Sequence, residues 1–270
     1  MPYAISDKPS AFDRMAFNYD RQFTDTQLAR ALRSRVWERL AVHIRPGMRT
    51  LEIGCGTGED AVWLAERGAR VVATDISPAM LEVTRRKAER AGVAGKIDTR
   101  ILDAASPAAG FSDGEFGMAV SNFGALNCVS DVGPIARALS EWIQPGGKLV
   151  FVFLGRWCAW EIAWHLFHLQ PRTALRRLRL GGVDARVGDG MVHVWYPPIG
   201  KIREAFGSEF RLARVMGLGV FLPPSYLESI VARRPRLFRL LARLERTAGS
   251  VFLFARLADH VILEFERVGR

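Results

Sequence analysis

Cysteine is scarce in this 270-residue sequence, which contains only Cys55, Cys128 and Cys158. Their number is odd, and their spacing matches neither a disulfide framework nor a pair of metal ligands. Long apolar runs are also missing, because residues 149–154 are too few to span a bilayer and residues 251–265 are interrupted by charges. Residues 1–20 are polar and contain no apolar core of the kind that a signal peptide needs. We therefore expect a cytoplasmic protein in a reducing compartment.

The composition is that of a folded globular protein, with 49% hydrophobic and 24% charged residues. A chain of this length suits one large domain, or a core with a cap, and we treat residues 1–270 as a single domain. Lysine and arginine outnumber acidic residues by 38 to 28, which gives a formal net charge of +10. Such an excess is compatible with an acidic substrate, a nucleic acid, an anionic membrane surface or simply solvated arginine faces. Charge alone does not decide among them.

The stretch LEIGCGTGED, residues 51–60, has the pattern of a strand, a tight turn and the start of a helix. Glycines at alternate positions let the backbone approach a ligand closely, because no Cβ intervenes and positive φ is accessible. These are Gly54, Gly56 and Gly58. A dinucleotide-binding turn would need a third glycine where this chain has Glu59. Glu59 and the acidic residues near it would also repel a pyrophosphate, whereas a ligand with a cationic centre would tolerate them.

Strands and helices are predicted to alternate from residue 49 onwards, which is typical of a parallel sheet with crossover helices. The predicted strands are residues 50–53, 70–74, 97–102, 116–121 and 148–154. The predicted helices are residues 59–67, 79–91 and 132–143, preceded by two N-terminal helices at residues 11–20 and 25–44. Ser77 is placed to cap the helix that begins with Pro78.

An acidic residue stands at the predicted carboxyl end of each of the first three strands: Glu52, Asp75 and Asp103. In open α/β sheets, ligands bind outside these strand ends. A carboxylate after the second strand can accept hydrogen bonds from both ribose hydroxyls, and one after the third strand can accept a hydrogen bond from an adenine amino group. Each acid alone would be an ordinary turn or cap residue. Together, behind a glycine turn, they indicate a ligand that carries ribose and adenine.

The pattern E-x-G-x-G-x-G, the strand-end acids and the turn at residues 144–149 resemble the class I S-adenosylmethionine-dependent methyltransferases, over about residues 11–155. The resemblance is to the type 11, quinone-biosynthesis-like group in particular. It implies S-adenosylmethionine as methyl donor, S-adenosylhomocysteine as product, and a Rossmann-like α/β fold. The implied seven-stranded sheet has the order 3-2-1-4-5-7-6, with strand 7 antiparallel and helices on both faces. Gly117 departs from the family, which often has aspartate at the start of strand four.

The resemblance also implies a set of cofactor-binding residues. Asp75 would hold the ribose, Asp103 would meet the adenine edge, and Tyr19 would fold over the cofactor from an N-terminal helix. The glycines would line the methionine portion, and residues 121–123 would lie beside the reacting sulfonium. The full set is Tyr19, Glu52, Gly54, Cys55, Gly56, Gly58, Asp75, Ile76, Met80, Asp103, Ala104, Ser121, Asn122 and Phe123.

The second half of the chain should contain strands at residues 191–196, 209–216 and 260–266 and a helix at residues 201–206. In the strand order of the resembled fold, two inserts, residues 155–198 and 217–259, leave from the ligand face of the sheet. We therefore expect both inserts to cap the substrate site. Aromatic residues in the inserts suggest an apolar substrate pocket. They are Trp157, Trp160, Trp164, Phe167, Phe221, Tyr226 and Phe238.

These features predict transfer of a methyl group to a small, largely apolar molecule, such as a lipid, a quinone or a polyketide-like compound. A general base is needed only if the acceptor must lose a proton. The candidates are His193, Tyr196 and His165, followed by His168 and Tyr226. We expect no metal, since Asp131 alone does not form the acidic cluster that a cation-dependent enzyme needs. The substrate, the acceptor atom and the oligomeric state stay open.

Two other functions stay open as alternatives: an RNA methyltransferase, and a non-catalytic S-adenosylmethionine-binding module that acts through its basic surface. RNA is the weaker of the expected partners, because the sequence contains no recognised nucleic-acid-binding module. We expect no action on DNA, because residues 121–127 lack the proline turn that clamps a flipped base. Residues 233–246 carry arginines and leucines at helical spacing, which makes them a candidate contact with an anionic membrane.

Overall fold

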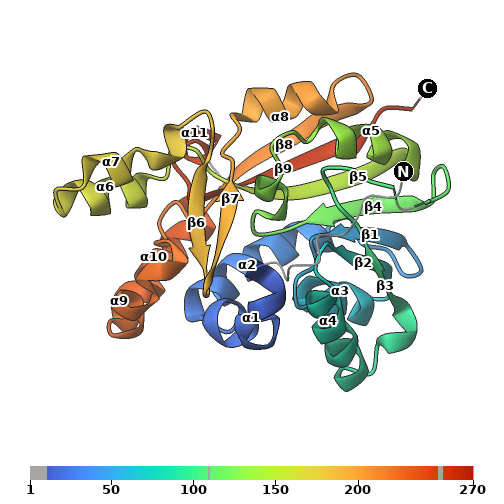
Figure 1. Cartoon of the computed structure of the whole chain (residues 1–270), viewed down its shortest axis with the longest axis horizontal. Helices are drawn as coiled ribbons and strands as arrows, with labels where there is room; N and C mark the ends of the chain where they lie inside the picture. Colours follow the sequence, from blue (N-terminus) through green and yellow to red (C-terminus); the bar gives the residue numbers. More distant parts are fainter. Residues whose placement is uncertain (1–10, 109, 249–251, 270) are drawn as a thin grey trace.

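The structure, a computed structural model, describes residues 11–108, 110–248 and 252–269. A seven-stranded sheet with the order β3-β2-β1-β4-β5-β9-β8 runs through it (Figure 1). β9 (His260–Arg267) is antiparallel to both of its neighbours, β5 and β8 (Phe210–Leu218). The other strands pair in parallel: β1 (Arg49–Ile53), β2 (Arg70–Asp75), β3 (Ile97–Ile101), β4 (Phe116–Ser121) and β5 (Ile143–Leu154). The predicted strand order, including the antiparallel seventh strand, is confirmed.

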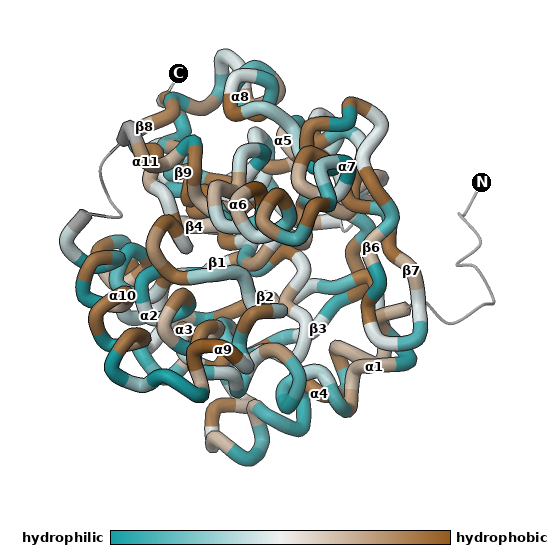
Figure 2. Tube along the Cα trace, turned by 90° about the vertical axis from the view of Figure 1, so that its left-hand side faces the viewer, coloured by the Kyte–Doolittle hydropathy of each residue, from teal (hydrophilic) through white to brown (hydrophobic). Residues whose placement is uncertain are grey.

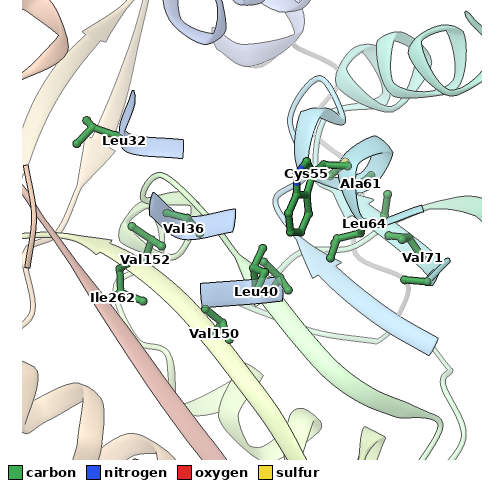
Figure 3. Close-up of a cluster of buried hydrophobic side chains, with 14 of the residues drawn as sticks. Leu32, Val36, Leu40, Cys55, Ala61, Leu64, Val71, Val150, Val152 and Ile262 are labelled. Carbon is green, nitrogen blue, oxygen red and sulfur yellow. The ribbon is translucent and has the colours of Figure 1, made fainter. Parts of the chain in front are cut away.

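Helices cover both faces of the sheet, because the central strands carry apolar side chains on both sides. On β5, Val150 and Val152 face one helical layer, whereas Phe151 faces the other. Figure 3 shows the first layer, in which leucine and valine side chains of α2 pack on β5 and β9. This layer contains α2 (Gln27–Ala41), α3 (Glu59–Glu66) and α4 (Pro78–Arg90), and the second contains α5 (Gly133–Trp142) and α8 (Ile199–Phe206).

The helix that follows β2 begins as its sequence indicates. Ser77 Oγ accepts a hydrogen bond from the amide of Met80 at 3.1 Å, and Pro78 is the first residue of α4. At the N-terminus the chain differs slightly from the prediction. The expected single helix is α1 (Ala11–Tyr19) followed by a π-helical turn (Asp20–Thr24), which carries the chain round towards α2.

The start of β5 also differs from the prediction. β5 begins at Ile143, and residues 144–147 bulge out between the pairs Phe116–Ile143 and Met118–Lys148. The predicted strand began only at Lys148, after this glycine-rich bulge. Ile143, which pairs with Phe116 ahead of the bulge, follows directly on α5 and gives no separate sequence signal for a strand. A Cβ atom at Gly117, within the same register shift, would lie 3.2 Å from Cγ of Met48. Packing therefore favours glycine at this position.

The remaining elements lie mostly outside the sheet. β6 (Val183–Val187) and β7 (Gly190–Val194) form a separate antiparallel hairpin, of which the sequence predicted only the second strand.

The expected insert 217–259 includes residues 249–251, which are outside the described residues. Among the residues described, no helix has both the length and the apolar character needed to cross a membrane. The other elements are η2 (Ala94–Lys96), η3 (Ala125–Cys128), α6 (Ala159–Phe167), α7 (Pro171–Ala174), η4 (Arg176–Leu178), η5 (Ser225–Leu227), α9 (Glu228–Ala232), α10 (Pro235–Ala248) and α11 (Phe252–Ala255).

The β6–β7 hairpin stands next to α1 in Figure 1. Its turn packs directly on that helix, and a Cβ atom at Gly190 would lie only 2.4 Å from Cβ of Ala11. At Gly188, which has a φ of +58°, the nearest atom would be Cβ of Met15 at 3.4 Å. The glycines in the turn therefore allow a close approach of the hairpin to α1, which encloses the space between them and the sheet.

Candidate active site

A pocket of about 500 Å³ lies at the carboxyl ends of the parallel strands. This volume is typical of sites for small molecules and cofactors. Its wall combines strand-end residues such as Asp75 and Asn122 with residues from α1, α2, the hairpin, η5 and the start of β9. We call the part lined by the glycine turn the cofactor end, and the part lined by the hairpin and η5 the acceptor end.

The glycine turn at the cofactor end has left-handed backbone at Gly54, Gly56 and Gly58, with φ values of 70°, 54° and 78°. Two of the three glycines are required by packing. A Cβ atom at Gly54 would lie 2.2 Å from Cβ of Ala125, and one at Gly58 would lie 2.6 Å from Cγ2 of Thr84. A Cβ atom at Gly56 would meet nothing within 4 Å, and Gly56 lines the pocket. The open side of Gly56 is thus where a ligand can reach the backbone.

Asp75 ties the glycine turn to the end of β2. Its Oδ2 accepts a hydrogen bond from the amide of Gly56, and its Oδ1 accepts one from the amide of Ser77, both at 2.9 Å. Burial raises the pKa of Asp75, and the hydrogen bonds from these two amides offset only part of that effect. Each carboxylate oxygen has a further lone pair. Asp75 can therefore hold the turn and accept hydrogen bonds from a ligand at the same time.

A second carboxylate, Asp60, joins three elements around the cofactor end. It accepts hydrogen bonds from Nη1 of Arg33 at 2.5 Å, Nε1 of Trp37 at 2.6 Å and Nδ2 of Asn122 at 2.9 Å. Burial acts to lower the pKa of Arg33, but the adjacent Asp60 carboxylate outweighs it and the pKa is raised. The Arg33 guanidinium also lies 4.7 Å from the centre of the Phe123 ring. Asp60 and Arg33 both line the pocket, and the predicted set omitted both.

Two of the three acids at the glycine turn are compensated by ion pairs. Glu59 forms an ion pair with Lys87 at 2.9 Å, and Asp60 forms one with Arg33. Glu52 is buried behind the turn, and its Oε2 has no hydrogen-bond partner in the described part of the chain. Burial raises the pKa of Glu52 well above its usual range, and the nearby Asp60 adds to this. Two of the charges that were expected to repel a pyrophosphate are therefore neutralised by neighbouring side chains.

Most of the predicted cofactor residues line the pocket, and three do not. Glu52, Gly58 and Ser121 are absent from the wall, because Glu52 and Ser121 are buried behind the turn and Gly58 packs against Thr84. Ser121, for example, donates a hydrogen bond from Oγ to the carbonyl of Ile53 at 2.9 Å. The predicted residues that the structure brings together on the wall are Tyr19, Gly54, Cys55, Gly56, Asp75, Ile76, Met80, Asp103, Ala104, Asn122 and Phe123.

The hairpin presents its apolar side to the acceptor end. Val192 and Val194 of β7 line the pocket, as does Tyr196 just beyond the strand. Side chains alternate along a strand, so His193 points the other way. Its Nδ1 lies 2.7 Å from Oδ1 of Asp184, and its Nε2 lies 2.7 Å from the carbonyl of Gly181. His193 is thus held outside the pocket.

His165 is also outside the pocket. It lies on α6, where its Nδ1 is 2.9 Å from Oε1 of Gln170. Of the three leading candidates for a general base, the structure therefore brings only Tyr196 to the pocket wall. Asn127 helps to hold this region in place, because its backbone carbonyl and its side-chain amide bind the backbone of Trp195 at 2.8 and 2.7 Å.

The aromatic residues of the inserts do not form the pocket that the sequence suggested. Of those named, only Tyr226 lines it. α6 projects away from the sheet, so its tryptophans lie outside the pocket, and Trp160 donates a hydrogen bond from Nε1 to the carbonyl of Phe221 at 3.1 Å (Figure 1). At the acceptor end, apolar lining comes instead from smaller side chains, among them Leu154, Ala185, Val187, Val192 and Val194. Residues of both inserts nevertheless contribute to the wall.

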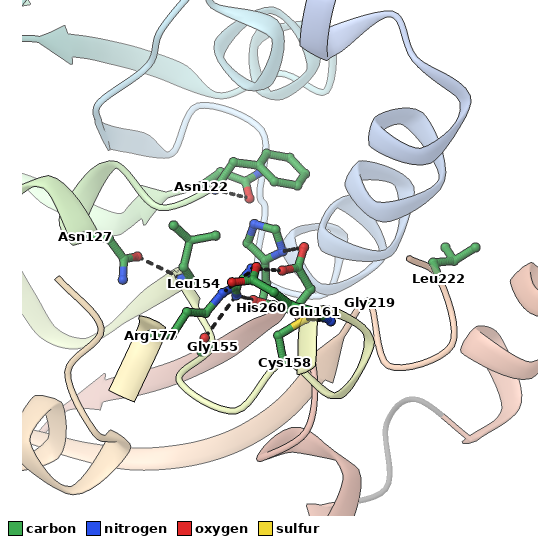
Figure 4. A network of polar contacts seen from close by, with 12 residues as sticks. Asn122, Asn127, Leu154, Gly155, Cys158, Glu161, Arg177, Gly219, Leu222 and His260 are labelled. Atoms are coloured by element: carbon green, nitrogen blue, oxygen red, sulfur yellow. Dashed lines mark hydrogen bonds and ion pairs between the residues drawn. The ribbon is translucent and has the colours of Figure 1, made fainter. Parts of the chain in front are cut away.

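A buried polar network, missed by sequence reasoning, reaches the acceptor end at His260 (Figure 4). Nδ1 of His260 lies 3.2 Å from Oδ2 of Asp259, and its ring meets that of Phe123 edge to face at 5.5 Å. Nη2 of Arg177 donates to Oδ1 of Asp259 and to Oε2 of Glu161, both at 2.7 Å. The adjacent Asp-His pair at the start of a predicted strand was the only signal for it.

Neighbouring charges keep both Asp259 and Arg177 of this network ionised. Burial acts to raise the pKa of Asp259, but His260 and Arg177 outweigh it, and the pKa lies well below its usual range. Burial likewise acts to lower the pKa of Arg177, but Asp259 and other neighbours keep it raised. Asp259 is therefore a fixed negative charge behind His260, and Arg177 is the fixed positive charge that balances it.

Comparison with known proteins identifies the fold and the family. Residues 50–147 match the model of a family described as a methyltransferase domain. A demethylmenaquinone methyltransferase of Beutenbergia cavernae is 35% identical over 184 residues, which cover 63% of this chain and 70% of that protein. This chain belongs to the class I S-adenosylmethionine-dependent methyltransferases. The residues that match the family model include the glycine turn, Asp75 and all of α5.

Other methyltransferases match different shares of the chain. A demethylmenaquinone methyltransferase of Thermus thermophilus is 38% identical over 119 residues, 42% of this chain and 52% of that protein. The chain therefore matches about half the length of that relative. A solved S-adenosylmethionine-dependent methyltransferase of Mesorhizobium loti has a TM-score of 0.55 and 21% identity, and covers 86% of this chain and 97% of its own. At that identity the likeness shows the fold alone.

The cofactor end of this methyltransferase fits S-adenosylmethionine, the cofactor of its family. The open side of Gly56 admits a ligand to the backbone, and Asp75 keeps acceptor capacity for ribose hydroxyls. Ile76 and Met80 supply apolar flanks for a base, and Asp103 provides a carboxylate beside them. Asp103 Oδ1 accepts a hydrogen bond from the amide of Ala105 at 2.8 Å, which fixes its direction. These residues would hold the cofactor.

Proposed function

We propose that this methyltransferase acts on a small, largely apolar molecule, with quinones as the leading class. The observation that carries the proposal is the continuity of the pocket, which runs from the glycine turn to an apolar end formed by the hairpin and Leu154. The names of relatives support the quinone class, because they include demethylmenaquinone methyltransferases and a ubiquinone biosynthesis O-methyltransferase of Methylocella silvestris that is 35% identical over 119 residues.

S-adenosylmethionine, when bound, supplies an electrophilic methyl group on a sulfonium. The chain contributes mainly by holding the acceptor in line and excluding water, effects that are worth up to about 7–11 kcal/mol. Val192, Val194 and Leu154 form the apolar surface against which an acceptor can be positioned. Phe123, held by the Arg33 guanidinium on one side and by the edge of His260 on the other, lies where the two ends of the pocket meet.

An acceptor that carries a proton must lose it during transfer. We propose His260 as the proton acceptor, because its ring lines the acceptor end beside Phe123. Asp259 is a positioning residue, since its fixed charge stabilises the imidazolium that forms. Tyr196 is the second candidate from the same wall, but burial raises its pKa and disfavours the phenolate. This assignment replaces the proposed roles of His193 and His165, which lie outside the pocket.

Labelled-methyl transfer tests this function. The protein is incubated with S-adenosylmethionine labelled in the methyl group and with lipid and aqueous extracts, and the labelled products are identified. We expect label in a small molecule of the lipid extract. The variant His260→Gln should then lower kcat by about 100-fold or more while the cofactor affinity stays the same. His193→Gln is the matched control and should leave kcat within about twofold.

Several outcomes would contradict the proposal. Label recovered only in RNA would indicate a nucleic-acid methyltransferase. Cofactor binding without transfer to any extract would indicate a non-catalytic module. Equal effects of the two histidine substitutions would refute the role of His260 but leave the substrate class intact.

A further inference from the structure

We propose that α6–α7 and α10 together form a docking surface for an anionic lipid bilayer, placed at the acceptor end of the pocket. The surface is defined here as residues 157–180 and the outer side of α10. It is independent of the proposed reaction, because it rests on exposure and charge alone. In the structure, these two segments, which are far apart in the chain, lie on one side of the molecule.

Large apolar side chains are exposed on the first segment. Phe167 is 83% exposed, and Leu169 and Leu180 are each 88% exposed. Side chains of this kind are usually buried, and a group of them in one segment is typical of an interaction site. The same segment also exposes Trp157, Leu166 and Leu175.

The charged side chains that this segment exposes are all positive. Residues 162–183 contain no aspartate or glutamate. Glu161, just before them, is buried in its ion pairs with Arg176 and Arg177. Arg172 and Arg179 are exposed and have no ion-pair partner within the described ranges. An apolar tip surrounded by unpaired arginines is complementary to an anionic interface.

The outer side of α10 has the same character. Leu240 and Leu244 are exposed there, whereas Phe238 and Leu241 pack inwards on the core. The only acidic residue of the helix, Glu245, is buried and accepts hydrogen bonds from backbone amides near Gly219. It therefore presents no negative charge to the outside. The exposed arginines of α10 are Arg236, Arg239, Arg243 and Arg246.

The two segments form one side of the molecule. α6, α7, α9 and α10 all face the viewer in Figure 2, and the same elements form the left-hand side of Figure 1. α6 contacts the residues that lead from β8 towards α9 and α10: Trp160 donates a hydrogen bond to the carbonyl of Phe221, and the ring centres of His165 and Tyr226 are 6.3 Å apart. Ser225 and Tyr226 are exposed and also line the pocket, so the acceptor end reaches the surface on this side.

A bilayer suits this surface better than the other macromolecules do. A second copy of the chain would bring an equally cationic face against it, and like charges repel. RNA would use the arginines and could stack on the rings of Phe167 and His168, but the exposed aliphatic side chains of Leu169 and Leu180 would gain nothing from it. A bilayer with anionic headgroups uses both the arginines and the apolar side chains. Each arginine near such a surface strengthens binding by about fivefold.

Vesicle flotation of the full chain tests the proposal, with phosphatidylcholine vesicles compared with vesicles that also contain phosphatidylglycerol. We expect binding to the anionic vesicles and weak binding to the neutral ones. The double variant Arg172→Glu with Arg239→Glu should weaken anionic-vesicle binding by about 30-fold or more. Its control, Arg90→Glu with Arg203→Glu, changes the net charge equally at exposed positions on other sides of the molecule and should have little effect.

A second pair of variants tests the apolar contribution. Phe167→Ser with Leu169→Ser should weaken vesicle binding by about tenfold or more, because two large side chains no longer enter the interface. Val42→Ser, at an exposed apolar position just after α2, is the control and should bind as the wild type does. Both variants change exposed residues, so circular dichroism should show the wild-type fold.

Three results would overturn the proposal. These are equal binding to neutral and anionic vesicles, equal losses in the variants and their controls, or binding to RNA without binding to vesicles. Light scattering would detect the remaining alternative, a dimer that Phe167→Ser with Leu169→Ser dissociates. The readout is binding rather than activity, so its failure would leave the proposed methyl transfer untouched. Failure of the methyl transfer would equally leave the vesicle result standing.

Discussion

The two ends of the pocket are built in different ways. At the cofactor end, backbone groups make the important contacts: Asp75 holds the amides of Gly56 and Ser77, and the turn passes through three left-handed glycines. At the acceptor end, side chains from distant segments meet: Val194 of the hairpin, Tyr226 of η5 and His260 of β9. The backbone cradle of the first end comes from the turn at residues 54–58 and the end of the neighbouring strand, whereas the second end needs segments from the whole fold.

This difference suggests a division of labour within one pocket. A backbone cradle is hard to vary and suits a donor that is the same throughout the family. Side chains brought by inserts can change without disturbing the sheet, which suits an acceptor that differs between members. The buried network of Arg177 borders the acceptor end, whereas Asp60 and Arg33 border the cofactor end. Substitutions in each should therefore affect the two ends separately.

The largest effect is expected for Arg177→Met. This change leaves Asp259 and Glu161 buried without their shared partner, and it should lower the free energy of unfolding by about 3–5 kcal/mol. Urea denaturation at neutral pH measures it. In the protein that remains folded, the affinity for S-adenosylmethionine should stay within about threefold of the wild type, because the cofactor end is not touched.

Arg172→Met is the control for this prediction. Arg172 is exposed and should contribute a few tenths of a kcal/mol at most. If Arg177→Met cost less than about 1 kcal/mol, or if it abolished cofactor binding in the folded protein, the separation of the two ends would be wrong.

The next largest effect is expected for Asp75→Ala, at the other end. The substitution removes two charge-assisted hydrogen bonds that hold the glycine turn, and with them the acceptor for ribose hydroxyls. Calorimetry should show cofactor binding weakened by about 100-fold or more. Asp98→Ala, at an exposed ion pair on β3, is the control. Unchanged affinity in Asp75→Ala would place the cofactor elsewhere.

A smaller loss of stability, which does not distinguish the two ends of the pocket, is expected for Glu264→Gln. Glu264 of β9 binds Arg39 and His43, and so fastens α2 and the loop after it to the sheet beneath the pocket. Burial acts to raise the pKa of Glu264, but the hydrogen bonds from His43 and Arg39 outweigh it and lower the pKa to about 2. The substitution should cost about 2 kcal/mol of stability at neutral pH.

The stability that Glu264→Gln removes should itself decrease at low pH. The folded pKa of Glu264 lies below the usual value of 4.5, so its stabilisation is complete above pH 4.5 and disappears as the pH falls towards 2. The gap between wild type and Glu264→Gln in urea denaturation should close over that window. Glu266→Gln, at a more exposed ion pair on the same strand, should cost only a few tenths of a kcal/mol. A gap that persists at pH 2 would contradict the assignment.

The sheet and the cofactor end could be predicted because their signals are local. The glycine turn lies within ten residues of sequence, and each strand-end acid follows its own apolar strand. The acceptor end could not be predicted in this way. Whether His193 faces the pocket depends on which side of the hairpin meets the sheet, and the sequence predicted only one strand of that hairpin. The tryptophans of α6 were misplaced because an amphipathic pattern does not say which neighbour a helix packs against.

A crystal structure with S-adenosylhomocysteine tests the central claim most directly. The account predicts the ribose at Asp75, the adenine between Ile76 and Asp103, and the sulfur directed past Phe123 towards His260. Open space should then remain between the sulfur and the valines of β7 for the acceptor. A ligand that fills the acceptor end with its adenine, or whose sulfur points away from His260, would contradict the account.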